Sequence, residues 1–317
     1  MAYWPLATWT ARSPGYEARA ANLAGMISRR RGPFAAGDHV QLTDPKGRRH
    51  LVVLEPGKSF FTHRGSLDHD DLIGSQDGSV VRSSGGTPYV ALRPLLADFT
   101  LAMKRGAAVV YPKDAAQIIA MADVFPGARV IEAGAGSGAL TCWLLRATGD
   151  CGAVTSFERR ADFAEIARRN VGQFFGGAHP AWHLVVGDFG RAGAGQAAAD
   201  RVILDMLAPW DCLEAAARVL IPGGVICCYV ATTTQLSRTV EALRGQGSFD
   251  EPAAWESLVR GWHVDGLAVR PEQRMVGHTG FLVSARRLAD GVTPPPRRRR
   301  PAKGAHQDED DMDSASP

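Results

Sequence analysis

The sequence predicts an α/β protein in which a Rossmann-like domain with an open parallel sheet follows a smaller β-rich domain. An apolar run at 130–133 ends in the glycine-rich turn 134–138, which continues into a helix-forming run. Three acidic residues, Glu158, Asp188 and Asp205, each come at the end of a further strand-like run. Ligand groups at the carboxyl ends of strands are typical of an open α/β sheet.

Changes in composition divide the chain into five segments. Residues 1–31 are interpreted as an N-terminal extension, and residues 291–317 as a disordered tail, because proline, arginine and acidic blocks cannot bury a core. Between them we predict a small β-domain at 32–92, a helical connector at 93–126 and the Rossmann-like domain at 127–290.

The elements of the first two domains follow from local patterns. Strand-like runs at 40–43 and 50–54 flank Asp44-Pro45-Lys46-Gly47, where the proline presets the second position of a turn and the glycine closes it. In the connector, helices are predicted at 95–103 and 115–121, the second preceded by Tyr-Pro-Lys-Asp.

In the third domain, strands and helices alternate, as a doubly wound fold requires. The region 160–174 has a helical apolar stripe, and a second helix is predicted at 209–220, because proline is tolerated at a first helical position. Strands are predicted at 225–230 and 279–285.

The spacing of the glycines favours one class of cofactor. Dinucleotide folds prefer G-x-G-x-x-G, whereas Gly134, Gly136 and Gly138 form G-x-G-x-G behind Glu132, the pattern of S-adenosylmethionine-dependent methyltransferases. In such a site Glu158 would accept hydrogen bonds from both ribose hydroxyls, because a carboxylate offers only acceptors. The predicted cofactor contacts are Glu132, Gly134, Gly136, Ser137, Gly138, Ala139, Leu140, Glu158, Asp188, Phe189 and Asp205.

Asp188 is assigned to the adenine amino group of the cofactor. The alternative is that residues 134–138 are an ordinary strand-to-helix turn and that the acidic residues are solvated or cap helices.

Composition sets the outer limits. The 317 residues are 45% hydrophobic, no apolar stretch is long enough to span a membrane, and the first residues lack the pattern of a secretory signal. We therefore expect a cytoplasmic protein without membrane contact. The five cysteines lie in apolar runs without C-x-x-C spacing, so buried reduced thiols are expected, and no metal site.

The net charge of +3 resides in the body of the chain, because five basic and five acidic residues cancel in the tail. Basic clusters that could bind the phosphates of a polyanion occur at 29–31, 48–49, 63–64, 104–105 and 286–287. A solvated surface explains them equally well.

The motifs of 32–287 together resemble the bacterial, actinobacterial-type tRNA (adenine-58-N1)-methyltransferase family. The resemblance rests on Gly-Pro-Phe at 32–34, Phe-Phe-Thr-His-Arg-Gly at 60–65, Leu-Ile-Gly at 72–74, Tyr-Pro-Lys-Asp at 111–114, Glu-Ala-Gly-Ala-Gly-Ser-Gly at 132–138, Leu-Asp-Met-Leu-Ala-Pro-Trp at 204–210 and Gly-His-Thr-Gly-Phe-Leu-Val at 277–283. It implies a small N-terminal β-domain, a seven-stranded catalytic domain, a homotetramer, and methylation of adenine N1 in the T-loop of tRNA.

One position departs from the pattern of archaeal relatives. Their loop resembles Asp-x-Pro-x-Pro-Trp, whereas this chain has Leu207 in place of the first proline. The shape of the loop after Asp205 is therefore less determined than the aspartate itself.

The target atom suggests a mechanism. Asp205 is predicted as the catalytic residue, which accepts a hydrogen bond from the adenine N6 amino group and stabilises the positive charge that grows on the base. The alternative is a cap for the helix that begins at Pro209. The target base must also be extruded into a pocket.

Two further residues are predicted to bind substrate. Tyr111 would stack on the target adenine or hydrogen-bond to it, and the alternative is a buried hinge tyrosine. His278 would hold phosphates together with the basic pairs, and the alternative is a structural histidine.

Two other functional classes remain open. A noncatalytic RNA-binding subunit would keep the fold without the chemistry, and a methyltransferase for protein or small molecules would share the glycine turn. A nicotinamide oxidoreductase is more remote because of the glycine spacing.

Overall fold

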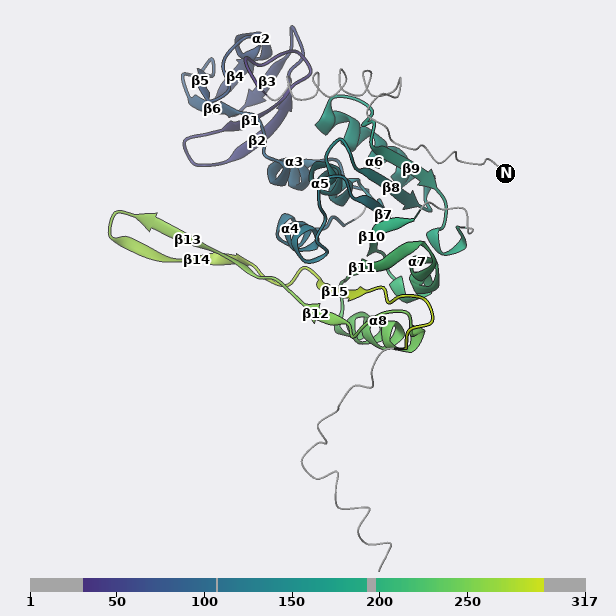
Figure 1. Cartoon of the computed structure of the whole chain (residues 1–317). Coiled ribbons are helices and arrows are strands. Elements are labelled where there is room, and N and C mark those ends of the chain that lie inside the picture. Colours follow the sequence, from purple (N-terminus) through teal and green to yellow (C-terminus); the bar gives the residue numbers. More distant parts are fainter. Residues whose placement is uncertain (1–30, 107, 193–197, 294–317) are drawn as a thin grey trace, which may run out of the picture.

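The computed structural model describes residues 31–106, 108–192 and 198–293. Apart from Arg31 and residues 291–293, the predicted N-terminal extension and disordered tail lie outside these described residues. Figure 1 shows a β-rich N-terminal part, a central α/β part and a long two-stranded ribbon.

The N-terminal part combines a four-stranded antiparallel sheet in the order β2-β1-β6-β5 with a separate hairpin. Its elements are β1 (His39–Thr43), β2 (Arg49–Val53), β3 (Ser59–Thr62), β4 (Gly65–Asp68), α2 (His69–Leu72), β5 (Ser79–Arg82) and β6 (Pro88–Leu92). The predicted turn between the first two strands is confirmed by the hydrogen bond from Gly47 N–H to the Asp44 carbonyl, 2.9 Å. Leu42, Leu54 and Tyr89 are among the side chains in its core.

Two helices form the connector, α3 (Leu96–Ala102) and α4 (Pro112–Met121). The second begins three residues before the predicted start, because Pro112 occupies the first helical turn, where its missing N–H costs nothing. Tyr111 is the N-cap residue of α4.

The central part is a seven-stranded sheet in the order β12-β15-β11-β10-β7-β8-β9. Strands β7 to β11 run parallel, and β15 pairs antiparallel with β11 and β12. The strands are β7 (Arg129–Ala133), β8 (Ala153–Glu158), β9 (Trp182–Val186), β10 (Ala199–Asp205), β11 (Leu220–Val230), β12 (Ala253–Trp255) and β15 (Phe281–Arg286). The helices that cover them are α5 (Ala139–Thr148), α6 (Ala161–Phe175), α7 (Leu213–Val219) and α8 (Thr233–Gln246), with 3-10 turns η1 (Phe189–Arg191) and η2 (Pro209–Cys212).

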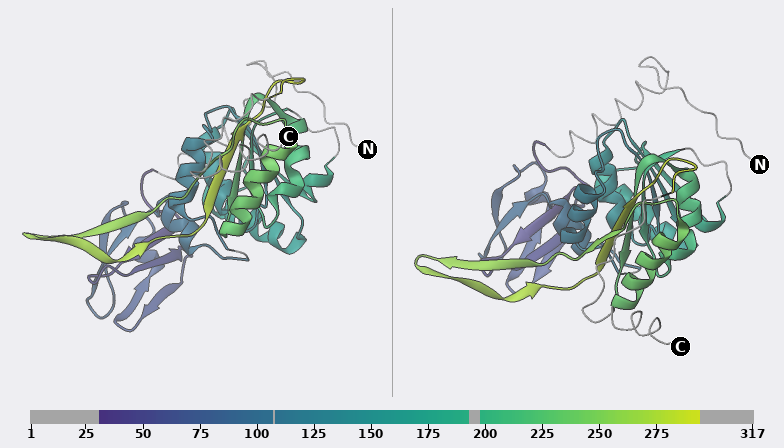
Figure 2. Two further views of the ribbon diagram at one scale, coloured as in Figure 1. Left: turned by 90° about the horizontal axis from the view of Figure 1, so that it is seen from below. Right: turned by 60° about the horizontal axis from the view of Figure 1, so that its bottom comes forward.

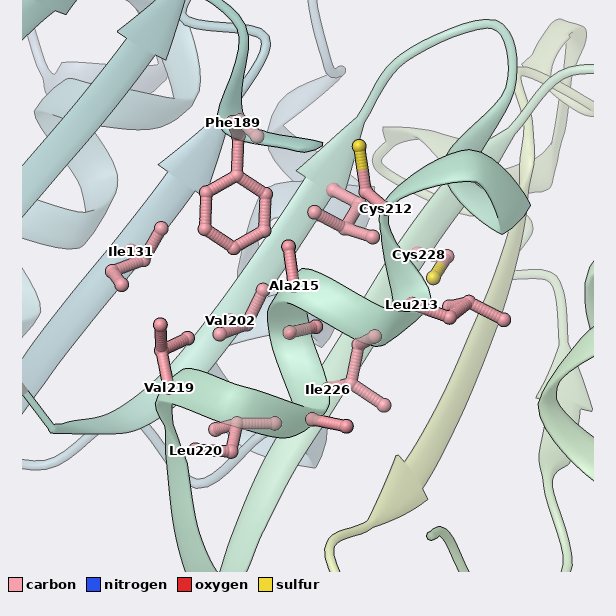
Figure 3. Close-up of a cluster of buried hydrophobic side chains, with 14 of the residues drawn as sticks. Ile131, Phe189, Val202, Cys212, Leu213, Ala215, Val219, Leu220, Ile226 and Cys228 are labelled. Atoms are coloured by element: carbon pink, nitrogen blue, oxygen red, sulfur yellow. The ribbon is translucent and has the colours of Figure 1, made fainter. Parts of the chain in front are cut away.

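Alternating residues of β10 join the cores on the two faces of the sheet. Val202 and Leu204 pack in the cluster that includes residues of α7, shown in Figure 3, whereas Ile203 packs with residues of α4 and α5. Because both faces are buried, the strand is almost continuously apolar, as expected for a central parallel strand.

The helix predicted at 209–220 is wrong in its extent. It is divided into η2 and α7, and Leu220 is already the first residue of β11, where it pairs with Ala199 of β10. The pairing with a neighbouring strand overrides the local helical pattern. The prediction that all five cysteines are buried is also wrong, because Cys151 is exposed beside the end of α5, while the other four are buried.

The sequence analysis did not predict the ribbon formed by β13 (Val259–Asp265) and β14 (Ala268–Val276). It projects from the same side of the central sheet as the N-terminal part (Figures 1 and 2). Trp262 and Val264 are 58% and 67% exposed and share one face with Pro271 and Val269, their cross-strand partners. The described ribbon therefore displays an apolar surface to solvent.

Within the described ranges, no helix has the length and apolar character that a membrane crossing requires. The same residues contain no group of three or more histidine, cysteine or acidic side chains suited to a metal ion.

Candidate active site

The glycine turn lies between the end of β7 and the start of α5, against the end of β10. Gly134 has φ +94°, and a Cβ at this position would lie 1.8 Å from the Asp205 carbonyl oxygen. Gly138, at φ +79°, caps α5 and lies against Ala167 and Val171 of α6. These glycines are therefore required where the backbone of the turn meets β10 and α6, and the first contact brings Asp205 to the turn.

Glu158, at the end of β8, reaches into the same turn. One carboxylate oxygen accepts from Gly136 N–H at 2.9 Å and the other from Arg160 N–H at 3.0 Å. The side chain is almost fully buried. In this structure, main-chain donors thus occupy the acceptors that were predicted for ribose hydroxyls.

Glu132, near the end of β7, is fully buried beneath the turn. Its Oε2 accepts hydrogen bonds from the hydroxyls of Thr141, 2.6 Å, and Ser156, 2.5 Å. Its Oε1 is buried and has no hydrogen-bond partner among the described residues. Burial raises the pKa of Glu132 to about 7, opposed by the two hydroxyls and reinforced by the charge of Glu158.

Asp205, the last residue of β10, is half-buried next to these two acids. Burial first, and then the charges of Glu132 and Glu158, raise its pKa to about 7. Three carboxylates therefore meet at the glycine turn. Such a cluster favours a ligand that carries positive charge or several hydrogen-bond donors.

Asp188 and Phe189 follow β9. The Asp188 carboxylate accepts a hydrogen bond from Gly190 N–H at 2.9 Å and so caps η1. The same carboxylate lies 3.8 Å from the guanidinium of Arg159. The ring of Phe189 is 2% exposed and packs on Phe157, and Figure 3 shows it within the core cluster. A predicted contact of Phe189 with a cofactor is therefore limited to its main chain.

The remaining predicted residues, Ser137, Ala139 and Leu140, contact other segments of the chain. The Ser137 hydroxyl accepts from Gly106 N–H at 3.0 Å, while its carbonyl accepts from the Asn170 amide at 2.8 Å. Ala139 and Leu140 are buried in the first turn of α5. These residues hold the turn against α6 and the segment before α4.

Tyr111 and His278 are close in sequence to contacts of a buried aspartate, Asp114, that sequence reasoning did not select: Asp114 N–H donates to the Tyr111 carbonyl at 2.9 Å, and Thr279 follows His278. Asp114 is fully buried and accepts hydrogen bonds from Thr279, from Ser257 at 2.9 Å, and from Lys113 at 2.6 Å. Its contacts thus join the Tyr-Pro-Lys-Asp and Gly-His-Thr-Gly motifs. The only signal in the sequence that could have pointed to Asp114 was that both motifs belong to the same family resemblance.

Asp114 and its hydrogen-bond partner Thr279 also contact β11, the strand beside Asp205. The Tyr229 hydroxyl donates to the Thr279 carbonyl at 2.8 Å and lies 3.4 Å from Asp114, and Tyr229 is the β11 partner of Asp205. A Cβ on Gly280 would lie 2.4 Å from the Tyr229 ring, so this glycine permits the close approach. Asp114 therefore fixes the loop before β15 next to the carboxyl edge of the sheet.

His278 uses both ring nitrogens within the chain. Nδ1 lies 3.0 Å from the Glu256 carboxylate and Nε2 lies 2.9 Å from the Ala231 carbonyl oxygen. Both partners are acceptors, so both nitrogens donate only when the ring is protonated. The bonds to Ala231 and Glu256 accordingly raise its pKa. This geometry favours the structural alternative over phosphate binding.

The loop after Asp205 is held by α8. The Leu207 carbonyl accepts from the Gln235 side chain at 2.9 Å, and the guanidinium of Arg238 lies 4.1 Å from the centre of the Trp210 ring. Leu207 itself is 81% exposed. The N-cap residue of η2 is Ala208, so Asp205 does not serve as the helix cap considered as its alternative role.

Comparisons with known proteins match both the N-terminal and the central parts of the chain. A family model described as TrmI-like N-terminal matches residues 32–81, and one described as tRNA methyltransferase complex GCD14 subunit matches 89–266. The tRNA (adenine(58)-N(1))-methyltransferase TrmI of Thermus thermophilus is 39% identical over 246 residues, which cover 78% of this chain and 95% of that relative. The chain belongs to the tRNA (adenine-58-N1)-methyltransferase family.

A second member of this family resembles this chain in sequence, and two solved methyltransferase structures resemble it in fold. The tRNA (adenine(57)-N(1)/adenine(58)-N(1))-methyltransferase TrmI of Methanocaldococcus jannaschii is 32% identical over 77% of this chain and 93% of its own. An S-adenosylmethionine-dependent O-methyltransferase structure from Thermotoga maritima superposes with TM-score 0.77 at 31% identity, covering 86% of this chain and 98% of that one. The structure of the tRNA (m1A58) methyltransferase TrmI of Aquifex aeolicus superposes with TM-score 0.71 at 26% identity, covering 81% of this chain and 100% of that one. The predicted fold, a seven-stranded Rossmann-like domain after a small β-rich domain, is confirmed.

Proposed function

We propose that this protein transfers a methyl group from S-adenosylmethionine to N1 of adenine 58 in the T-loop of tRNA, which gives 1-methyladenosine. The observation that carries the proposal is the convergence of Glu132, Glu158 and Asp205 on the glycine turn. It occurs in a chain whose relatives bear the name of this activity.

The residues at the turn fit S-adenosylmethionine. When bound, this cofactor supplies an activated methyl group on a positively charged sulfur. Glu132 contributes a buried acceptor oxygen without a partner among the described residues, which suits a cationic, donor-bearing ligand. Glu158 would hold the ribose hydroxyls once its oxygens are released from the main chain, and Asp188 the adenine amino group.

Asp205 would act on the substrate base. Its carboxylate, at the exposed edge of the acidic cluster, accepts a hydrogen bond from the adenine N6 amino group and so fixes the orientation of the ring. A negative charge there also stabilises the positive charge that develops on the base during transfer. The pKa of Asp205 is raised to about 7 without a ligand, and a positively charged ligand beside it would lower that pKa and favour the ionised form that this role needs.

We further propose that the protein works as a homotetramer in the cytoplasm, where its tRNA substrate is found. The apolar face of the ribbon supports association, because a two-stranded ribbon is marginal by itself and large exposed apolar surfaces mark contact sites.

Nucleoside mass spectrometry tests the function. Unmodified tRNA is incubated with the full chain and S-adenosylmethionine, digested, and compared with tRNA whose adenine 58 is replaced by guanine. We expect 1-methyladenosine only in the first sample. Efficient methylation of a protein or small molecule in place of RNA, or cofactor-independent RNA binding without product, would replace the proposal by one of the two alternatives.

A further inference from the structure

The hairpin of β3 and β4 carries an exposed aromatic side chain. Phe61 is 78% exposed, whereas its neighbour Phe60 is half-buried, lies 5.3 Å from the His50 ring and packs on the core of the N-terminal part. Successive residues of a strand face opposite sides, so Phe61 points away from that core. Its exposure therefore has no explanation in the packing of this part.

Basic residues outnumber acidic ones in the chain segments around Phe61. Residues 59–68, which form the hairpin, contain one acid, Asp68, which lies on the same face as Phe61 and accepts a hydrogen bond from the Ser59 hydroxyl at 2.6 Å. Residues 78–88, which contain β5 and the following turn, contain no aspartate or glutamate. The two segments contain His63, Arg64 and Arg82. A flat apolar ring with cationic residues in the adjoining segments is complementary to a nucleobase and its phosphates.

The turn beside Phe61 is fixed by the turn between β5 and β6. A Cβ on Gly65 would lie 2.5 Å from Ser84 Oγ, and a Cβ on Gly85 would lie 2.4 Å from the Arg64 carbonyl oxygen. The Ser83 hydroxyl donates to that carbonyl at 2.7 Å, and Ser66 N–H donates to Ser84 Oγ at 3.0 Å. The hairpin tip is thus rigid although it buries little apolar surface, which lowers the entropic cost of binding a ligand.

We propose that Phe61 is a stacking platform for an unpaired nucleobase of the tRNA other than the target adenine, with Arg64 and Arg82 near the adjoining phosphates. The proposal rests on the proposed function for the identity of the RNA. Base–aromatic stacking is tolerant of sequence, so this contact positions the tRNA and does not read adenine 58.

Binding of unmodified tRNA, measured by fluorescence anisotropy without cofactor, tests the platform. We expect Phe61→Leu to weaken binding about tenfold, the scale of one stacked base, and Phe61→Tyr to stay within twofold of wild type. Leu95→Ala, which removes a side chain that is 69% exposed outside this region, serves as the matched control and should not change affinity.

The measurement does not require methyl transfer, so it separates this proposal from the proposed function. Equal affinity of wild type and Phe61→Leu overturns the platform even if 1-methyladenosine is formed. Equal losses for leucine and tyrosine also overturn it, because a ring would then not be the requirement. A change in the oligomer mass of Phe61→Leu would show that the ring contacts another subunit and not RNA.

Discussion

The acidic cluster at the glycine turn and the ribbon of β13 and β14 are opposite kinds of surface in one chain. The cluster gathers three carboxylates at a largely buried edge of the sheet, with the pKa values of Glu132 and Asp205 raised to about 7. The ribbon exposes apolar side chains such as Trp262 and Val264. Each arrangement costs free energy in the isolated chain, the first through repulsion and the second through contact with water. Both costs decrease when a suitable ligand or subunit binds.

The largest effect should come from the cluster. We expect Asp205→Ala to lower single-turnover methylation of tRNA about a hundredfold or more, the usual scale for one preorganised electrostatic group. Dissociation constants for cofactor and tRNA should stay within a few-fold, and Asp205→Asn should be intermediate because its amide still accepts from N6 without charge. Asp211→Ala, an exposed acid of the same loop, is the control. Full recovery of Asp205→Ala at high cofactor concentration would make Asp205 a cofactor ligand.

A second change tests cofactor binding at the same cluster. Glu158→Ala should weaken S-adenosylmethionine binding by about 2 kcal/mol, or roughly thirtyfold, because donors lose a buried acceptor. Calorimetry measures the affinity, with Glu165→Ala, an exposed acid of α6, as the control. NADH should not bind. Unchanged affinity of the Glu158 variant would show that this carboxylate only holds the Gly136 and Arg160 amides.

The ribbon offers the opposite test, in which charge is added to an apolar surface. Trp262→Asp should weaken self-association at least tenfold, because the fully desolvated aromatic residues of an interface contribute most of its energy. Analytical ultracentrifugation should show a tetramer for wild type and smaller species for the variant. His263→Asp, on the opposite face of the same strand, should remain tetrameric. If Trp262→Asp also remains tetrameric, this face of the ribbon is not a subunit contact.

The smallest effect concerns the dependence of folding stability on pH. The raised pKa values of Glu132 and Asp205 mean that the folded chain binds more protons than the unfolded chain between about pH 4 and 7. The free energy of unfolding should therefore fall across this window, and the ligand-free protein should melt several degrees lower at pH 8 than at pH 5.5. Asp205→Asn should melt higher than wild type at pH 8. Thermal unfolding followed by circular dichroism would contradict the clustered-charge account if the two proteins melt alike there.

Much of the site was predictable because its parts follow local rules. The glycine turn is read from a strand, a turn and a helix in succession, and Glu158 and Asp205 are identified because each ends an apolar strand. The pairing of the parallel strands then brings these ends together. Asp114 could not be selected in this way, because its partners Ser257 and Thr279 are 143 and 165 residues away.

Local patterns also failed where a long-range contact competed with them. Leu220 continues a helical pattern but pairs with β10, and Phe189 follows an acidic strand end but turns its ring into the core. Phe61 and Phe60 are indistinguishable by residue type, and only the direction of the strand separates the exposed ring from the packed one.

The sequence by itself determined the alternation of strands and helices around the glycine turn, the positions of the glycines, and the acidic residues at the strand ends, since these depend on backbone preferences and on periods of two or 3.6 residues. The tertiary structure decided which of these groups meet. It placed the Asp205 carbonyl where only Gly134 fits, it left one oxygen of Glu132 without a partner among the described residues, and it extended the ribbon into solvent. Such outcomes depend on close packing and on electrostatic interactions between distant segments, which no local pattern encodes.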